Sequence, residues 1–102
     1  MAAYVDHAFI VAAVPNGRRT VRSRWCHLTA DTVKELHEFA ARLGLRRAWF
    51  QPDTKSIRGG WHYDVTMTKR ALAVRLGARE VDRYELLEVM ARPDRETQKV
   101  PA

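Results

Sequence analysis

The clearest pattern of apolar and polar positions lies in residues 33–43. Apolar side chains recur there at intervals of three and four residues, which places Val33, Leu36, Ala40 and Leu43 on one face of a helix. The pattern Thr32-x-x-Glu35 is a capping box, and Gly44 follows the run as a stop signal. The sequence therefore predicts a helix over residues 33–43.

Shorter signals predict two more helices and a set of strands. Thr66 or Thr68 is expected to cap a helix over 69–76, and the box Asp82-x-x-Glu85 begins another that continues through Met90. Aromatic and β-branched residues predict strands over 2–6, 25–28, 45–51 and 78–81. Strands and helices thus alternate along most of the chain.

Alternating strands and helices are typical of a parallel sheet with crossover helices. We therefore expect an α/β fold, a small single domain with a mainly parallel sheet of about four strands. The chain has 102 residues, which suits one domain. We expect the domain to span residues 1–92 and the polar residues 93–102 to form a flexible C-terminal tail.

Polar residues lie where the predicted strands end. Asp6, His27 and Gln51 stand at or near the ends of three strands, and His62 and Asp64 lie just before the second helix. Open α/β sheets bind ligands outside the carboxyl ends of their strands. We therefore expect these five side chains to converge on one edge of the sheet.

Three kinds of chemistry fit this set. His27, His62 and Asp64 could bind a divalent metal, because imidazole and carboxylate are ligands for zinc, iron, nickel and manganese. Alternatively, His27 or His62 could transfer a proton while Asp6 or Asp64 orients it, without a metal. The set could also hold a ligand without any reaction, or simply satisfy helix ends and loops. No H-E-x-x-H, paired Cys-x-x-Cys or phosphate-loop motif favours one alternative.

The formal net charge is +6, and arginine outnumbers lysine. This balance favours an anionic partner such as a nucleotide or nucleic acid, although arginine-rich composition is also typical of high-GC coding sequences. Four arginines crowd between the turn at residues 15–17 and Trp25, as an exposed hairpin arm or a solvated loop.

The residues expected to contact the ligand are Gln51, Arg70, Arg22, Arg24 and His37. For His37, which borders the buried face of its helix, a role in the core is the competing interpretation.

Cys26 is the one cysteine, so the chain forms no internal disulfide, and a plain buried thiol is expected. No apolar run approaches the roughly 18–20 residues that span a bilayer, and the first residues lack the pattern of a signal peptide. We therefore expect a cytoplasmic protein without a membrane partner. The small size leaves room for a homodimer.

Several segments together form a specific set: Tyr4-Val5-Asp6, Trp25-Cys26-His27-Leu28-Thr29-Ala30-Asp31, Glu35-Leu36-His37-Glu38-Phe39-Ala40, Trp49-Phe50-Gln51, His62-Tyr63-Asp64-Val65, Arg70 and Gly77-Ala78. Through them the chain resembles the small bacterial and phage family known as domain of unknown function 4031. The resemblance implies that the family's characteristic polar set includes Asp6, His27, Asp31, His37, Gln51, His62, Asp64 and Arg70. It implies no established activity, and the basic segment before Trp25 departs from the family pattern.

The sequence thus predicts a small α/β protein whose site binds a phosphate-bearing ligand, either a nucleotide or a nucleic-acid backbone. As an enzyme it would be a hydrolase, and a divalent metal is one candidate cofactor beside metal-free acid–base chemistry. His27, His62, Asp64 and Asp6 would then be the catalytic residues, and Arg70 would clamp phosphate. The alternatives are a non-catalytic basic nucleic-acid-binding module and a regulatory domain that meets another protein through exposed aromatic residues such as Trp61.

Overall fold

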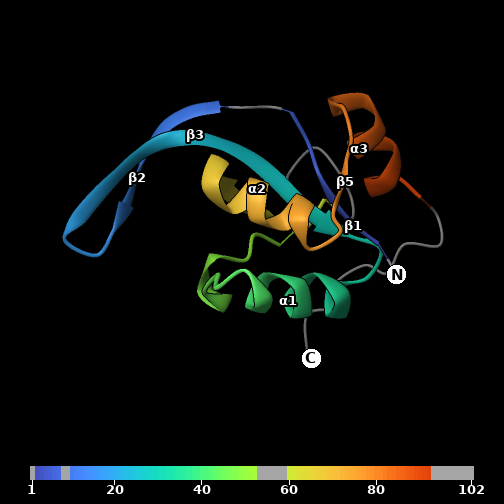
Figure 1. The fold of residues 1–102 in the computed structure, drawn as a ribbon, viewed down its shortest axis with the longest axis horizontal. Coiled ribbons are helices and arrows are strands. Elements are labelled where there is room, and N and C mark those ends of the chain that lie inside the picture. Colours follow the sequence, from blue (N-terminus) through green and yellow to red (C-terminus); the bar gives the residue numbers. More distant parts are fainter. Residues whose placement is uncertain (1, 8–9, 53–59, 93–102) are drawn as a thin grey trace.

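The computed structural model describes residues 2–7, 10–52 and 60–92, and for residues 10–16 and 21–23 it describes the backbone alone. The predicted tail therefore lies outside the described residues. The strands are β1 (Ala3–Val5), β2 (Ile10–Asn16), β3 (Arg19–Ala30), β4 (Tyr63–Thr66) and β5 (Arg79–Glu80). The helices are α1 (Val33–Arg42), α2 (Met67–Arg75) and α3 (Arg83–Met90), with a short 3-10 helix η1 (Arg47–Trp49) after α1 (Figure 1).

The five strands form one mixed sheet that is mostly antiparallel. Its order is β2-β3-β1-β5, and β4 pairs with β3. β3 is antiparallel to β1, β2 and β4, and β1 and β5 form the parallel pair. The prediction of a mainly parallel sheet is wrong. The reason is the tight turn at Gly17 and Arg18, with Gly17 at a φ of 64°, which returns the chain directly onto its neighbour and forces an antiparallel pair.

The strand predicted over residues 45–51 is also wrong. That segment forms η1, whose backbone N–H groups bond locally, from Trp49 to Arg46 and from Phe50 to Arg47. Only Gln51 makes an isolated bridge, to His62. Trp49 is 40% exposed and lies against the Arg46 guanidinium, so its apolar ring does not mark a buried strand here.

The predicted helices form where their caps place them. The Thr32 and Asp82 side chains accept the Glu35 and Glu85 N–H groups at 3.1 and 2.8 Å, which satisfies donors that would otherwise lack partners. Thr66, one of the two candidate caps, accepts the Lys69 N–H, so α2 begins at Met67, two residues earlier than predicted. The prediction of helix α1 is confirmed to within one residue at its end.

The sheet separates two apolar clusters. α1 and α2 contribute to the larger cluster on one face, together with residues such as Val5, Leu28 and Val65. α3 packs on the other face against Tyr4 (Figure 1). Because side chains alternate along a strand, His27 and Asp64 point away from the larger cluster, to the side of Tyr4 and α3. The described residues include no helix long and apolar enough to cross a membrane.

Candidate metal site

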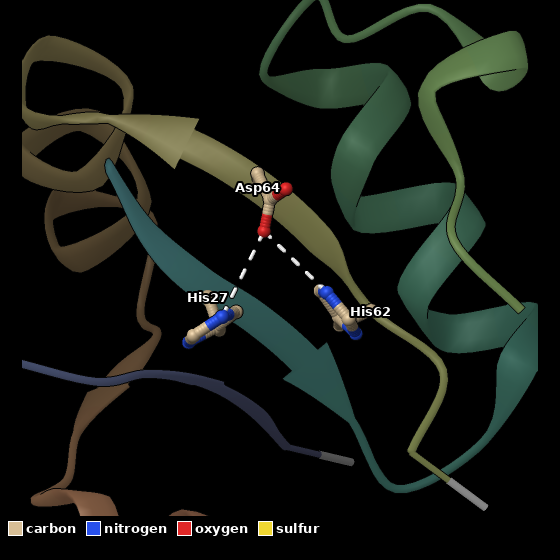
Figure 2. Close-up of side chains that lie close together, drawn as sticks. All are labelled: His27, His62 and Asp64. Atoms are coloured by element: carbon tan, nitrogen blue, oxygen red, sulfur yellow. Dashed lines mark ion pairs between the residues drawn. The ribbon is translucent and has the colours of Figure 1, made fainter. Parts of the chain in front are cut away.

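Two neighbouring strands bring His27, His62 and Asp64 together. His27 on β3 pairs directly with Asp64 on β4, and His62 lies two residues before Asp64 on the same face. Figure 2 shows both imidazoles turned toward the Asp64 carboxylate. The three side chains are therefore brought together by the His27↔Asp64 cross-strand pair and by the two-residue spacing that puts His62 and Asp64 on one face.

The three side chains present their ligand atoms to one small volume. Asp64 Oδ1 lies 3.8 Å from His27 Nε2 and 3.4 Å from His62 Nε2. One ligand atom from each side chain lies within 4.8 Å of the others. In a tetrahedral site with bonds of roughly 2.0–2.1 Å, ligand atoms stand about 3.3–3.5 Å apart. Small side-chain movements would therefore close the group around a transition-metal ion.

Asp6 orients His27 because its carboxylate accepts two hydrogen bonds from that residue. From the end of β1 to the start of β2 the chain advances five residues, Val5 to Ile10, while their partners on β3, Leu28 and Trp25, are three residues apart, so the pairing register shifts beside His27. The Asp6 carboxylate accepts the His27 backbone N–H at 2.8 Å and lies 2.7 Å from the ring Nδ1. Asp6 is 1% exposed, so this support is buried beneath the site.

The other two candidate ligands also have an outer partner. His62 Nδ1 lies 2.8 Å from the Gly60 carbonyl oxygen, and Gln51 Nε2 donates to Asp64 Oδ2 at 2.6 Å. Carboxylate and carbonyl oxygens only accept hydrogen bonds, so the Nδ1 atoms of His27 and His62 are the donors. In each neutral imidazole the lone pair then lies on Nε2, the atom that faces Asp64.

The electrostatics of the site favour a charged carboxylate and a basic imidazole. The hydrogen bond to Asp6 raises the pKa of His27 above its ordinary value, against the effect of burial. Burial acts to raise the pKa of Asp64, but the hydrogen bond and charge of His62, helped by His27 and Gln51, leave it below its ordinary value. Asp64 therefore stays ionised at neutral pH, and His27 holds a proton more readily than a free imidazole does.

All five side chains predicted to converge do lie together in the structure. Asp6, His27, Gln51, His62 and Asp64 are linked by the contacts above, although an antiparallel pair rather than a parallel sheet edge unites them. Their functional roles stay predictions.

The remaining predicted site residues lie elsewhere. Arg70 is 7% exposed and donates to the Asp6 carbonyl and the Glu80 carboxylate, so it supports the chain below the site instead of facing outward. His37 lies 2.8 Å from the Tyr63 hydroxyl and packs edge-on against Phe50, and burial lowers its pKa.

Arg22 and Arg24 belong to the part of β3 that pairs with β2. Arg24 precedes His27 by three residues on the same strand, and the side chain of Arg22 lies outside the described part of the structure. Asp31, which the family resemblance places in the polar set, accepts from the Tyr4 hydroxyl and lies 3.4 Å from an Arg92 nitrogen, away from the candidate ligands.

Sequence reasoning missed two groups around the site. The Gly60 carbonyl orients His62, and no sequence signal singles out one backbone carbonyl. Glu80 pairs with Arg70 at 3.0 Å, and only the β1–β5 pairing brings the two near. Trp61, offered as an exposed contact for a protein partner, is 0% exposed, so that part of the prediction is wrong.

The fold and these side chains define a small α/β protein with a candidate two-histidine, one-carboxylate centre. The chain belongs to the family described as "Protein of unknown function (DUF4031)", whose model matches residues 4–93. No curated protein and no solved structure matches the chain.

Proposed function

We propose that His27, His62 and Asp64 bind a divalent transition metal and that the protein uses it to hydrolyse a phosphate-bearing ligand. The observation that supports the metal is the set of outer partners: Asp6, the Gly60 carbonyl and Gln51 each hold one candidate ligand in place. Such outer partners are characteristic of metal sites because they fix the tautomer and orientation of the ligands. Zinc is the metal to test first, since it accepts both imidazole and carboxylate.

Three protein ligands are also the number typical of a catalytic centre. Structural zinc sites use four protein ligands, whereas catalytic sites keep a position for water or substrate. A bound metal would supply a Lewis acid and lower the pKa of a coordinated water. The protein's part is to hold the ligands: Asp6 keeps the lone pair of His27 on Nε2, and Gln51 holds the carboxylate of Asp64 by its second oxygen.

The phosphate-bearing ligand is supported by charge. The chain has a net charge of +6, and Arg83, at the start of α3, acts electrostatically on the imidazole of His27. Cationic surroundings raise the local concentration of an anionic substrate. A cytoplasmic location and a homodimer remain predictions of the sequence.

Calorimetric titration with zinc tests the metal centre. We expect one equivalent to bind the wild-type protein, and the substitutions His62→Gln and Asp64→Asn to weaken binding by at least about tenfold each. His37→Gln is the matched control, because His37 is a histidine on another face with no ligand role. If zinc bound all four proteins alike, or bound none, this centre would not exist.

Turnover is tested with bis(p-nitrophenyl) phosphate, a generic phosphodiester. We expect release of nitrophenol by the metal-loaded protein, loss of that activity in a chelator, and its return with zinc or manganese. An activity that survives both the chelator and Asp64→Asn would come from another site or from a contaminant.

A further inference from the structure

The β2–β3 hairpin forms an arm that extends beyond the helices. β2 and the first half of β3 pair from Ile10↔Trp25 to Asn16↔Arg19, and Figure 1 shows this two-stranded ribbon projecting past α2. We define the arm as residues 10–25. The same strand continues into the body of the sheet, where it supplies His27.

The arm carries its positive charge at the turn and along the first half of β3. The segment between Asp6 and Asp31 contains four arginines and no aspartate or glutamate, so it accounts for a charge of +4 within a chain whose net charge is +6. Arg18 and Arg19 at the turn and Arg24 near the body are exposed. Positive charge concentrated on one projecting element is the footprint of a polyanion contact.

The shape of the arm narrows the choice of polyanion. Two antiparallel strands lie about 4.8 Å apart, and the major groove of B-form DNA, about 12 Å wide, admits such a ribbon. The major groove of an A-form RNA helix is too narrow for side chains to read. We propose that the arm is a docking surface for duplex DNA, and that Arg18, Arg19 and Arg24 hold the duplex by contacts with its phosphate backbone.

This surface does not depend on the metal centre, but the two are connected by β3. Arg19 precedes His27 by eight residues on β3, an even number, so the two side chains lie on the same face of the strand, whereas Arg24, three residues before His27, lies on the opposite face. A duplex lying along the Arg19 face of the arm would bring phosphodiester groups toward His27. If the proposed metal-dependent hydrolysis is correct, DNA phosphodiesters are then the substrate class.

Fluorescence anisotropy with a labelled duplex of about 20 base pairs, roughly two helical turns, tests the proposal on the full chain. The test variant combines Arg18→Gln, Arg19→Gln and Arg24→Gln. The matched control combines Arg42→Gln, Arg46→Gln and Arg75→Gln, which are exposed arginines on or near α1 and α2 and change the net charge equally.

We expect the arm variant to lose at least about tenfold in affinity near 50 mM salt, and its log-affinity to depend on log salt with a slope reduced by about 2 to 3. The control should stay within about threefold of wild type, since its arginines lie away from the duplex. Thermal unfolding checks that each variant is folded, and Arg19→Gln alone replaces the triple variant if the triple variant is not.

Equal loss in both variants would show that net charge alone drives binding and would overturn the docking surface, as would unchanged binding by the arm variant. Tighter binding of a duplex RNA of the same sequence would overturn the choice of DNA. The anisotropy is measured without added metal and the zinc titration without DNA, so failure of the metal proposal and failure of this one give different results.

Discussion

The carboxylate of buried Asp6 accepts two hydrogen bonds from the same residue, His27, one from its backbone and one from its ring. The Asp6 carbonyl, in turn, accepts from Arg70 Nε at 2.9 Å. The position and tautomer of the imidazole are therefore set by the Asp6 side chain, and the backbone of Asp6 is held by the buried guanidinium of Arg70.

Substitution of Asp6 tests this relationship. In Asp6→Asn the amide oxygen can still accept the backbone N–H, but the amide NH2 group has no lone pair for Nδ1–H. His27 would then favour the tautomer with its proton on Nε2, and we expect zinc affinity to fall about 10- to 100-fold. A chelator-competition titration measures the change. Asp31→Asn, a carboxylate that bonds Tyr4 away from the site, should bind zinc as wild type does.

The pH dependence follows from the raised pKa of His27. A proton and a metal compete for Nε2, so zinc affinity should fall about tenfold per pH unit once the pH drops below that pKa. Because Asp6 is the largest cause of the raised pKa, the fall should begin at lower pH in Asp6→Asn. Titrations across about pH 5.5 to 8 measure both curves. Affinity that did not change over this range would exclude His27 as a ligand.

In the metal-free protein, the stability that His27 contributes to the fold should fall as the pH rises, the opposite of the trend in zinc affinity. A histidine whose folded-state pKa is raised contributes stability that is complete below the unfolded pKa of about 6.5 and is lost as the pH rises through the folded value. We therefore expect the Asp6–His27 contribution to the midpoint of urea unfolding to decline above about pH 6.5. The difference between wild type and His27→Gln isolates this contribution.

Arg70 should contribute more to the free energy of unfolding than its ion pair with Glu80 alone would supply. Glu80 is half exposed, so the pair contributes little, but Arg70→Met would leave the buried Asp6 carbonyl without this donor. We expect the free energy of unfolding to fall by about 2 kcal/mol, measured by urea denaturation. Arg75→Met, an exposed arginine on the same helix, should change it by less than about 0.5 kcal/mol.

Cys26 should be chemically inert in the folded protein. Burial, with the nearby Asp6 charge, raises the pKa of its thiol to about 12, and the residue is 1% exposed. The thiolate is the reactive form, so iodoacetamide at neutral pH should label the denatured protein and leave the native one unmodified. Fast labelling of the native protein, followed by mass spectrometry, would show that the strand opens around Cys26.

The sequence predicted the helices well because their signals are local. Thr32, Thr66 and Asp82 each bond a backbone N–H three residues on, and no distant partner is needed. Strand direction depends on which segments pair, and for the arginine-rich stretch after Gly17 the sequence left a hairpin arm and a solvated loop both open, whereas the structure forms the hairpin. The parallel sheet inferred from the order of elements was wrong for that reason.

Residue type singled out the site residues in the sequence, but it did not predict the strand pairing that brings them together. His27, His62 and Asp64 stood out by residue type, and the structure unites them through the His27↔Asp64 pair. The contribution of Asp6 depends on a register shift between β1 and β2, which no local pattern reveals. The buried placement of Arg70 likewise follows from the packing of α2 beneath the sheet and not from its neighbours in sequence.

β3 runs without interruption through 12 residues, from the turn at the tip of the arm to the end of the sheet core. Arg19 and His27 are eight positions apart on β3, which is at most about 26 Å at the rise of an extended strand. Because eight is an even number, both side chains lie on the same face of the strand. If a duplex docks on the arm as proposed, a phosphate at Arg19 and a phosphate at His27 would therefore lie no more than about eight base-pair steps apart along the DNA axis.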